Sequence, residues 1–211
     1  EKIALIGSNG AGKSTLMKLM VGLLKPSDGK VMLKGQSVGD TRPEKLSRYV
    51  SLVYQNPEDM FIKDSIEADI AYAMKVRNEE GWQERTEELL RRFRLTELKD
   101  RDGRLLSGGQ MRRASLAIGV ALQPEILLLD EPTANLDQEA IARLHDQIAC
   151  LKHQGRTVVI AEHRLYFLTD LIDRALYLRD GVLERTFNRE QFCGLTEQER
   201  EELGLRTLTL T

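Results

Sequence analysis

The sequence predicts an α/β fold with a mostly parallel sheet and an inserted helical segment. Three observations carry this prediction. A strand of buried character, Lys2–Ile6, runs directly into a glycine-rich turn and a helix. A continuous aliphatic run at Glu125–Asp130 lacks polar alternation, which is typical of a parallel strand covered on both faces. Between these two strands, residues 58–107 have a helical pattern throughout.

The first part of the chain alternates strand and helix. The glycine-rich turn after Lys2–Ile6 leads into a helix that we expect to run to about Leu24, because Pro26 and Gly29 then stop it. Two short β-rich segments follow, at Lys30–Leu33 and Tyr49–Tyr54.

The middle of the chain is helical in pattern from Asp64 to about Lys99. Asp64 can cap the first helix, with Glu67 three residues later. This helix presents one apolar face, formed by Ile66, Ile70, Ala73 and Met74. Gly81 breaks the pattern, and a second, charged helix follows at Glu84–Arg94.

The last part returns to alternation and ends in a tail with a capping box, Thr196 with Glu199. Gly204 lies past the end of the tail helix. The expected elements are a helix at Gln110–Leu122, the strand Glu125–Asp130, a helix at about Gln138–Gln154, the strand Thr157–Ala161, and a hairpin of Ala175–Leu178 and Val182–Arg185.

The composition is that of an ordinary globular protein: 211 residues, 41% hydrophobic, 30% charged, with a net charge of -2. This near-neutral balance gives no electrostatic reason to expect a nucleic acid partner. Cys150 and Cys193 are too few for a disulfide framework or a metal cluster, so a reducing cytoplasm is the expected setting. No apolar run approaches the roughly 20 residues that span a bilayer, so another polypeptide would have to cross any membrane served.

A phosphate-binding loop is the first motif that carries chemistry. Gly7, Gly12, Lys13 and Ser14 match the phosphate-loop pattern between a strand and a helix. Backbone N–H groups and the helix N-terminus would hold phosphates there, with Lys13 on the β- and γ-phosphates and the Ser14 hydroxyl on Mg²⁺. The predicted nucleotide contacts are Gly7, Ser8, Asn9, Gly10, Ala11, Gly12, Lys13, Ser14 and Thr15.

Two carboxylates follow the aliphatic strand. Asp130 lies at its carboxyl end, where α/β sheets bind ligands, and suits Mg²⁺ binding. Glu131 suits polarising an attacking water. In isolation, such a pair could equally be capping charge for the next helix.

A second glycine-rich segment, Leu106–Gln110, lies about ninety residues after the phosphate loop. Ser107, Gly108 and Gly109 open a helix, so they can either bind a phosphate or form a plain capped turn.

Three further polar residues are ambiguous when taken singly. Gln55 can ligate Mg²⁺ or be a surface glutamine, and His163 can contact a γ-phosphate or simply pack. Asp137 reads as the N-cap of the helix near Gln138.

In order, these motifs resemble the ABC-type ATPase domain. The series is the phosphate loop, Gln55, Leu106–Gln110, Leu127 to Thr133, Asn135 to Asp137, and His163. In that family two domains pair head to tail around two ATP molecules. The resemblance implies that Ser107, Gly108, Gly109 and Gln110 bind the partner's ATP, that Asp137 lines the seam, and that His163 contacts the γ-phosphate. It also implies ATP and Mg²⁺ as cofactors, with Mg²⁺ on Ser14, Gln55 and Asp130, and Glu131 and His163 as catalytic residues.

The resemblance organises the chain as one ABC ATPase domain, 1–211. Its parts would be an α/β core at 1–57 and 108–190, a helical subdomain at 58–107, and a tail at 191–211. We expect the antiparallel strands that usually open this domain, and the aromatic that stacks on adenine, to lie outside this chain. Because Lys2–Ile6 follows a single residue, we also expect a portion of the protein to precede it.

Some details look like the energy-coupling-factor importers, which take up vitamins and transition-metal ions. These are Gln55 to Asp59, Ala161 to Arg164, and the tail from Leu195 to Arg206, which is similar to the second half of tandem-fused ATPases. This likeness implies a subunit on the cytoplasmic face of the cell membrane, paired with a second ATPase domain and with membrane-embedded subunits. Met60, Phe61, Ile62 and Met74 are candidates for a groove that receives a membrane partner, or are ordinary core.

Two alternatives stay open. One is a soluble ABC ATPase of translation or DNA repair, and the other is half of an exporter. About ninety residues between the two glycine-rich segments argue against coiled-coil repair proteins, and two cysteines argue against the zinc-containing ones.

Overall fold

A six-stranded sheet forms the centre of the computed structural model, which describes residues 1–153 and 155–206. The strand order is β4-β5-β6-β1-β7-β8. All neighbours pair in parallel except β8, which is antiparallel to β7. The predicted mostly parallel sheet is therefore confirmed. The strands are β1 Lys2–Ile6, β4 Val50–Val53, β5 Ile126–Asp130, β6 Thr157–Ala161, β7 Arg174–Arg179 and β8 Val182–Asn188.

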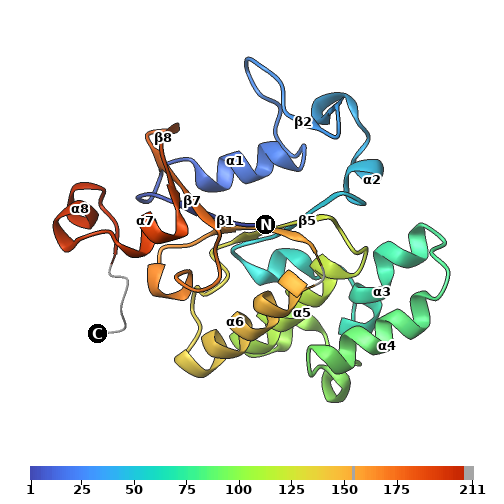
Figure 1. Cartoon of the computed structure of the whole chain (residues 1–211). Coiled ribbons are helices and arrows are strands. Elements are labelled where there is room, and N and C mark those ends of the chain that lie inside the picture. Colours follow the sequence, from blue (N-terminus) through green and yellow to red (C-terminus); the bar gives the residue numbers. More distant parts are fainter. Residues whose placement is uncertain (154, 207–211) are drawn as a thin grey trace.

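Helices cover both faces of this sheet. Figure 1 shows α1 on one face, α5 and α6 on the other, and α3 with α4 beside them. A short hairpin, β2 Met32–Leu33 with β3 Gln36–Ser37, lies near α1 and α2. The helices are α1 Lys13–Met20, α2 Pro43–Leu46, α3 Ile66–Val76, α4 Trp82–Arg92, α5 Gly108–Val120, α6 Gln138–His153, α7 Arg189–Cys193 and α8 Glu197–Glu202.

The aliphatic strands are buried on both sides. Every residue of β1 is buried, and alternate residues of β5 join different clusters. Leu127 and Leu129 pack with Ile148 of α6, whereas Leu128 packs with Met17 of α1. Removing apolar surface from water on both faces stabilises the sheet, which fixes its carboxyl edge as a platform for the loops that follow.

The first helix is shorter than predicted. It ends at Met20 rather than near Leu24, because Gly22 takes a left-handed conformation with φ 75°. The N–H groups of Leu23 and Leu24 then turn back to the Lys18 carbonyl, at 2.9 and 3.3 Å. Glycine reaches this conformation without steric cost, so the helix stops before the proline.

In the helical segment 58–107 the expected cap is wrong, and for Phe61 and Met74 the core, rather than the groove, is the alternative that the structure bears out. Ser65, rather than Asp64, caps α3, since its side chain accepts from the Ala68 N–H at 3.2 Å while the Asp64 side chain is fully exposed. Phe61 and Met74 belong to the hydrophobic core and cannot line an open groove. Ile62 is 59% exposed.

The tail packs against the sheet edge. The predicted capping box of Thr196 and Glu199 is present at the start of α8. The Tyr177 hydroxyl donates to the Leu203 carbonyl at 2.9 Å, which holds the end of α8 on β7. The sequence did not predict α7. Gln154, the expected last residue of α6, lies outside the described residues, as does the end of the tail, 207–211.

No helix in the described part of the chain is both long enough and apolar enough to cross a membrane.

Candidate nucleotide site and the signature segment

The phosphate loop connects β1 to α1 and leaves the helix N-terminus open. Gly7 is essential to its shape, because a Cβ there would lie 2.2 Å from the Leu178 carbonyl oxygen. Gly12 precedes α1 with no side-chain cap, so the first N–H groups of the helix have no side-chain acceptor from it. Gly7 and Ala11 are buried, whereas the exposed members of the predicted loop are Ser8, Asn9, Gly10 and Thr15.

Lys13 is held inside this loop. Its ammonium group donates to the carbonyls of Gly7 and Ser8, at 2.9 and 3.0 Å. Burial lowers the pKa of Lys13, and the nearby carboxylates of Glu131, Asp130 and Glu162 oppose that shift. A phosphate group would stabilise this partly desolvated cation.

Oxygen donors gather beside Lys13 at the end of β5. The Ser14 hydroxyl donates to Asp130 Oδ1 at 3.1 Å, and Asp130 is only 6% exposed. Mg²⁺ prefers oxygen ligands, so the adjacent Ser14 hydroxyl and Asp130 carboxylate fit it chemically, as would the amide oxygen of Gln55. No group of three His, Cys, Asp or Glu among the described residues could hold a metal ion.

Glu131 links three strand ends. Its N–H donates to the Ala161 carbonyl at the end of β6, at 2.9 Å, and its φ of 43° turns the chain sharply away from β5. Gln55, two residues past β4, donates from Nε2 to Glu131 Oε2 at 2.8 Å. His163 Nε2 lies 3.0 Å from Glu131 Oε1, a close approach without the alignment of a hydrogen bond. The structure therefore brings Gln55, Glu131 and His163 together.

The imidazole of His163 favours its neutral form. Burial and the positive charge of Lys13 lower the pKa of His163, while the carboxylates of Glu131 and Glu162 act against them. A neutral imidazole can donate one hydrogen bond to a phosphate oxygen or accept one from a water.

Two buried charges position these side chains, and the sequence reading missed their roles. Glu162 Oε2 accepts from the N–H and the hydroxyl of Thr133, at 3.2 and 2.6 Å. Glu162 Oε1 accepts from the N–H groups of His163 and Arg164, at 2.7 and 3.0 Å. This carboxylate therefore ties the loop after β5 to the loop after β6. Its neighbour His163 was singled out in the sequence, but nothing there marks Glu162 as buried.

Arg112 performs the corresponding role for Gln55. Its guanidinium donates to the carbonyls of Tyr54 and Gln55, both at 2.9 Å, and the side chain is 3% exposed. Burial lowers the pKa of Arg112, and the carboxylates of Glu162, Asp130 and Glu131 counteract it. A buried cation in α5 thus fixes the loop after β4.

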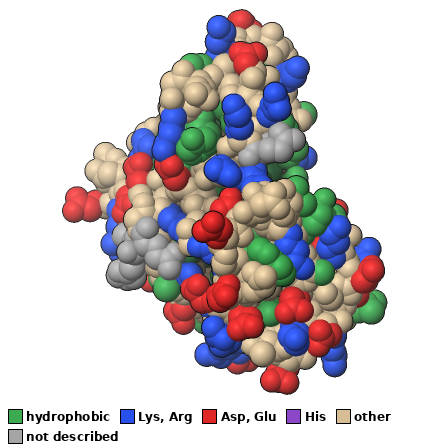
Figure 2. Space-filling model, turned by 90° about the vertical axis from the view of Figure 1, so that its right-hand side faces the viewer, with side chains coloured by type: hydrophobic (Ala, Val, Ile, Leu, Met, Phe, Trp, Pro, Cys, Tyr) green, Lys and Arg blue, Asp and Glu red, His purple; other side chains and the backbone are tan. Residues whose placement is uncertain are grey.

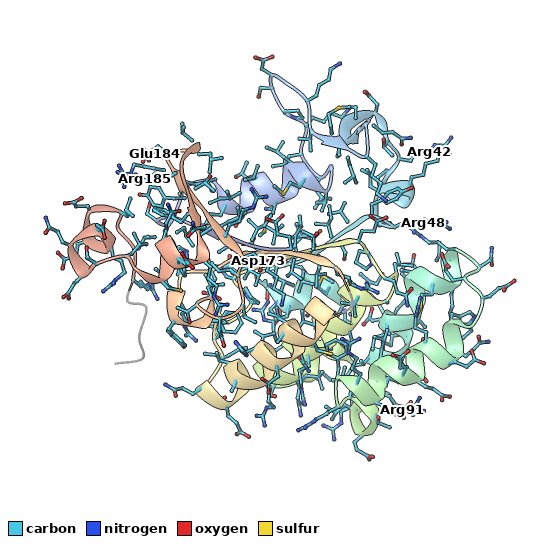
Figure 3. The ribbon with its side chains drawn as sticks, in the orientation of Figure 1. Arg42, Arg48, Arg91, Asp173, Glu184 and Arg185 are labelled. Carbon is cyan, nitrogen blue, oxygen red and sulfur yellow. The ribbon has the colours of Figure 1, made fainter. Side chains whose placement is uncertain are left out.

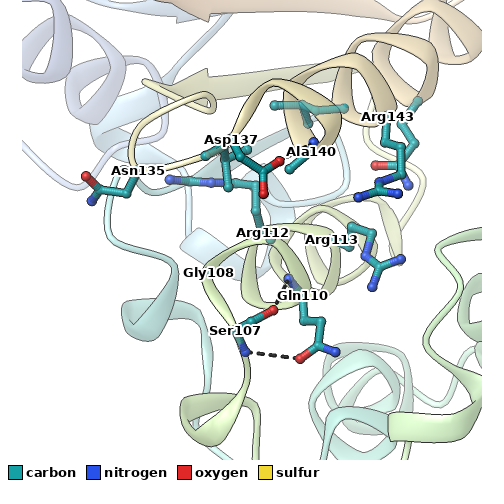
Figure 4. Close-up of a pocket in the computed structure, with 13 residues that line it drawn as sticks. Ser107, Gly108, Gln110, Arg112, Arg113, Asn135, Asp137, Ala140 and Arg143 are labelled. Carbon is teal, nitrogen blue, oxygen red and sulfur yellow. Dashed lines mark hydrogen bonds between the residues drawn. The ribbon is translucent and has the colours of Figure 1, made fainter.

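The second glycine-rich segment lies at the start of α5 and lines a separate cavity of about 370 Å³. Ser107 and Gln110 form a capping box, with Ser107 N–H donating to Gln110 Oε1 at 3.0 Å and Gln110 N–H donating to Ser107 Oγ at 3.4 Å (Figure 4). Asp137 accepts from the Ala140 N–H at 2.7 Å and so caps α6, as predicted. The residues described around this cavity include Gly108 and Gly109 but none of the phosphate loop.

Comparison with protein families shows which proteins share this arrangement. The model of the family described as ABC transporter matches residues 1–134, more than half of the chain. The chain belongs to this family. The resemblance read from its motifs is confirmed, and the chain is an ATPase of the ABC class that binds ATP.

Individual ABC proteins refine the likeness. The energy-coupling factor transporter ATP-binding protein EcfA of Methanoculleus marisnigri is 36% identical over 206 residues, which cover 93% of this chain and 74% of that protein. An ABC transporter ATP-binding protein of Methanosarcina acetivorans is 36% identical over 194 residues, and the match covers 90% of this chain. The chain spans only 37% of the length of that second relative.

Two solved ABC structures superpose closely. The structure of cbiO1 from Clostridium perfringens, described as part of the ABC transporter complex cbiONQ, is 28% identical with a TM-score of 0.80. The superposed region covers 94% of this chain and 80% of the cbiO1 chain. The ATP-binding cassette MJ0796, solved as a dimer with ADP and phosphate, has a TM-score of 0.79 over 90% of this chain and 85% of its own. At 24% identity it supports the fold alone.

Proposed function

We propose that this chain is the ATP-hydrolysing subunit of a membrane importer of the energy-coupling type, which works by head-to-tail pairing with a second ABC ATPase domain. One observation carries the pairing. The phosphate loop and the signature segment, Ser107–Gln110, line different cavities of the chain, so a nucleotide held by the loop is not covered by the segment. A second domain, in a homodimer or a heterodimer, would bring its own signature segment to that nucleotide. The likeness to EcfA and cbiO1 supports an importer.

In this proposal each part of the site has a defined task. The N–H groups of residues 7 to 15 and the Lys13 ammonium bind the phosphates. Ser14, Asp130 and Gln55 would hold Mg²⁺, which would supply positive charge against the phosphate oxygens. Glu131 orients and polarises the attacking water.

Other residues complete the closed state. His163, neutral and beside Glu131, contacts the γ-phosphate. Ser107, Gly108, Gly109 and Gln110 would bind the nucleotide held by the partner, and Asp137 would line the seam. ATP binding would close the pair, and hydrolysis would reopen it.

We further propose that residues 58–107 act as a helical subdomain that transmits this motion to a membrane-embedded subunit. A cavity of about 540 Å³ lies between this segment and the core, lined by Gln36, Lys45, Arg48, Tyr49 and Arg77. Figure 3 places Arg42 and Arg48 on this side, and Figure 2 looks onto it, with Lys and Arg side chains crowding its upper half. The chain would then sit peripherally on the cytoplasmic face of the membrane. Vitamins or transition-metal ions are the proposed cargo class, which this subunit would never touch.

Replacing Glu131 tests the proposal. Glu131→Gln should lower ATP turnover by about 10²–10³-fold, because the water loses its base, while ATP binding stays within about threefold. In the presence of ATP, a stable dimer of the variant should then accumulate, which size-exclusion chromatography with light scattering measures. Glu125→Gln, an exposed change at the residue before β5, is the matched control and should leave turnover unchanged. Undiminished turnover in Glu131→Gln, or no ATP-dependent pairing, would contradict the proposal.

A further inference from the structure

A hollow lined by basic residues lies between α4, α5 and α6, away from the phosphate loop. Its volume is about 230 Å³. Four arginines line it, namely Arg92, Arg94, Arg113 and Arg143. Arg92, Arg113 and Arg143 are half-buried, whereas Arg94 is exposed at the rim, so three of the four side chains are partly removed from solvent. Cys150 of α6 lies at the same hollow, 3.7 Å from Arg92 Nη2.

Among the residues that line this hollow, four are arginines and only one is a carboxylate. Asp146 is the one carboxylate among them; its side chain is 86% exposed and lies 3.6 Å from His145 Nδ1. Arg143 also bonds to Glu139, one turn back along α6. Burial lowers the pKa of Arg113, and the positive charges of Arg143 and Arg94 lower it further. Like charges confined in this way repel one another unless an anion joins them.

The macrodipole of α4 explains only part of the cluster. Arg92 lies in the last turn of α4, where a cation is favoured. Arg113 and Arg143 lie within the interiors of α5 and α6, where no helix end attracts them. Arg94 follows α4 with a φ of 54°, a position that glycine usually occupies. The cavity beside Ser107–Gln110 is called the signature cavity below. Figure 4 shows Arg113 and Arg143 on the same side of this cavity, which both residues also line.

We propose that this hollow binds a compact phosphate-bearing anion, held by Arg92 and Arg94 from one side and by Arg113 and Arg143 from the other. The planar guanidinium fork matches the oxygens of a phosphate group. The volume is below the usual 300–1,000 Å³ of drug-sized ligand pockets, which favours a small anion or the head group of a larger one. Because the anion would bridge the end of α4 to α5 and α6, it would fix the helical segment against α5, the helix that Ser107 caps. This site is distinct from the phosphate loop and does not depend on the function proposed above.

The test uses pyrophosphate as the probe, on a Lys13→Ala background that removes binding at the phosphate loop. Isothermal titration calorimetry at low ionic strength should show saturable binding. Arg92→Gln and Arg94→Gln should each weaken it by about tenfold, as expected for loss of a charge-assisted contact. Arg91→Gln is the matched control: Arg91 pairs with Glu87, its side chain is 66% exposed, and Figure 3 shows it at the outer edge of α4. The control should stay within about twofold of the parent.

A chemical readout locates the anion. Pyrophosphate should slow alkylation of Cys150 by iodoacetamide but not that of Cys193, which is also exposed. Vesicles of phosphatidylglycerol, tested by co-sedimentation, distinguish a lipid head group from a free phosphate as the natural source. Binding of either probe that depends on Arg92 and Arg94 supports the site. No saturable binding of either, or an equal loss in Arg91→Gln, would overturn it.

Discussion

The phosphate-loop region and the signature segment both present a helix N-terminus, yet they are built in opposite ways. Around the phosphate loop, side chains from four chain segments bond to one another, as in the contacts of Ser14 with Asp130 and of Gln55 with Glu131. In the signature segment, the described hydrogen bonds of Ser107 and Gln110 side chains stay within the same turn. The first region is organised by its own chain, whereas the second is capped and leaves its cavity open. This difference supports a nucleotide site completed from outside the chain.

Among the changes in binding or stability, the largest is expected from a substitution in the phosphate-loop region. Lys13→Ala should weaken ATP binding by roughly 10- to 100-fold, because it removes a charge-assisted contact to the phosphates. Binding of a fluorescent ATP analogue measures this loss. Lys18→Ala, an exposed change on the same helix, should bind ATP as the parent does. Equal binding by Lys13→Ala and the parent would show that the loop is not the nucleotide site.

A smaller effect is expected at the residue that joins the loops after β5 and β6. Glu162→Gln keeps the shape of the side chain but turns an NH₂ group toward N–H or O–H donors that now bond to a carboxylate. It should cost about 1–3 kcal/mol in the free energy of unfolding, measured by urea denaturation. Glu139→Gln, an exposed change in the first turn of α6, should cost less than about 1 kcal/mol. Equal costs would mean that the two regions do not differ in internal organisation.

Much of this molecule could be predicted from the sequence, since local patterns dominate where backbone geometry decides. The phosphate loop follows from its glycines, and β5 follows from an aliphatic run without alternation. The capping roles of Ser107 and Asp137 also follow from local rules. The parts that were missed depend on tertiary contacts.

Three residues show why. Glu162 looks like a surface glutamate until β6 places it under Thr133. Arg112 looks like helix surface until α5 packs beside the loop after β4. The sequence leaves Phe61 open between a groove and the core, and only its packing shows that it is 5% exposed in the core. In each case the neighbour is distant in sequence, so the pattern around the residue carries no signal.

The smallest expected effect concerns pH and is confined to the organised region. The pKa of His163 is lowered from its ordinary value of 6.5, mainly by burial. Below that value the unfolded chain takes up a proton that the folded chain resists, so stability should fall as the pH drops below 6.5. Thermal unfolding between pH 7.5 and 5.5 should show a smaller loss for His163→Gln than for the parent. Identical pH profiles would mean that His163 does not contribute to the pH dependence.

The central claim is that the phosphate loop and the signature segment act on the same ATP from different chains. The ATPase rate of an equimolar mixture of Lys13→Ala and Ser107→Arg chains tests it most directly. Each variant alone should be nearly inactive. Lys13→Ala lacks the lysine that binds the phosphates, and Ser107→Arg blocks the signature cavity. In a mixed pair, the intact loop of one chain meets the intact segment of the other, so activity should recover to roughly a quarter of the parent rate. A mixture no more active than its components would contradict the claim.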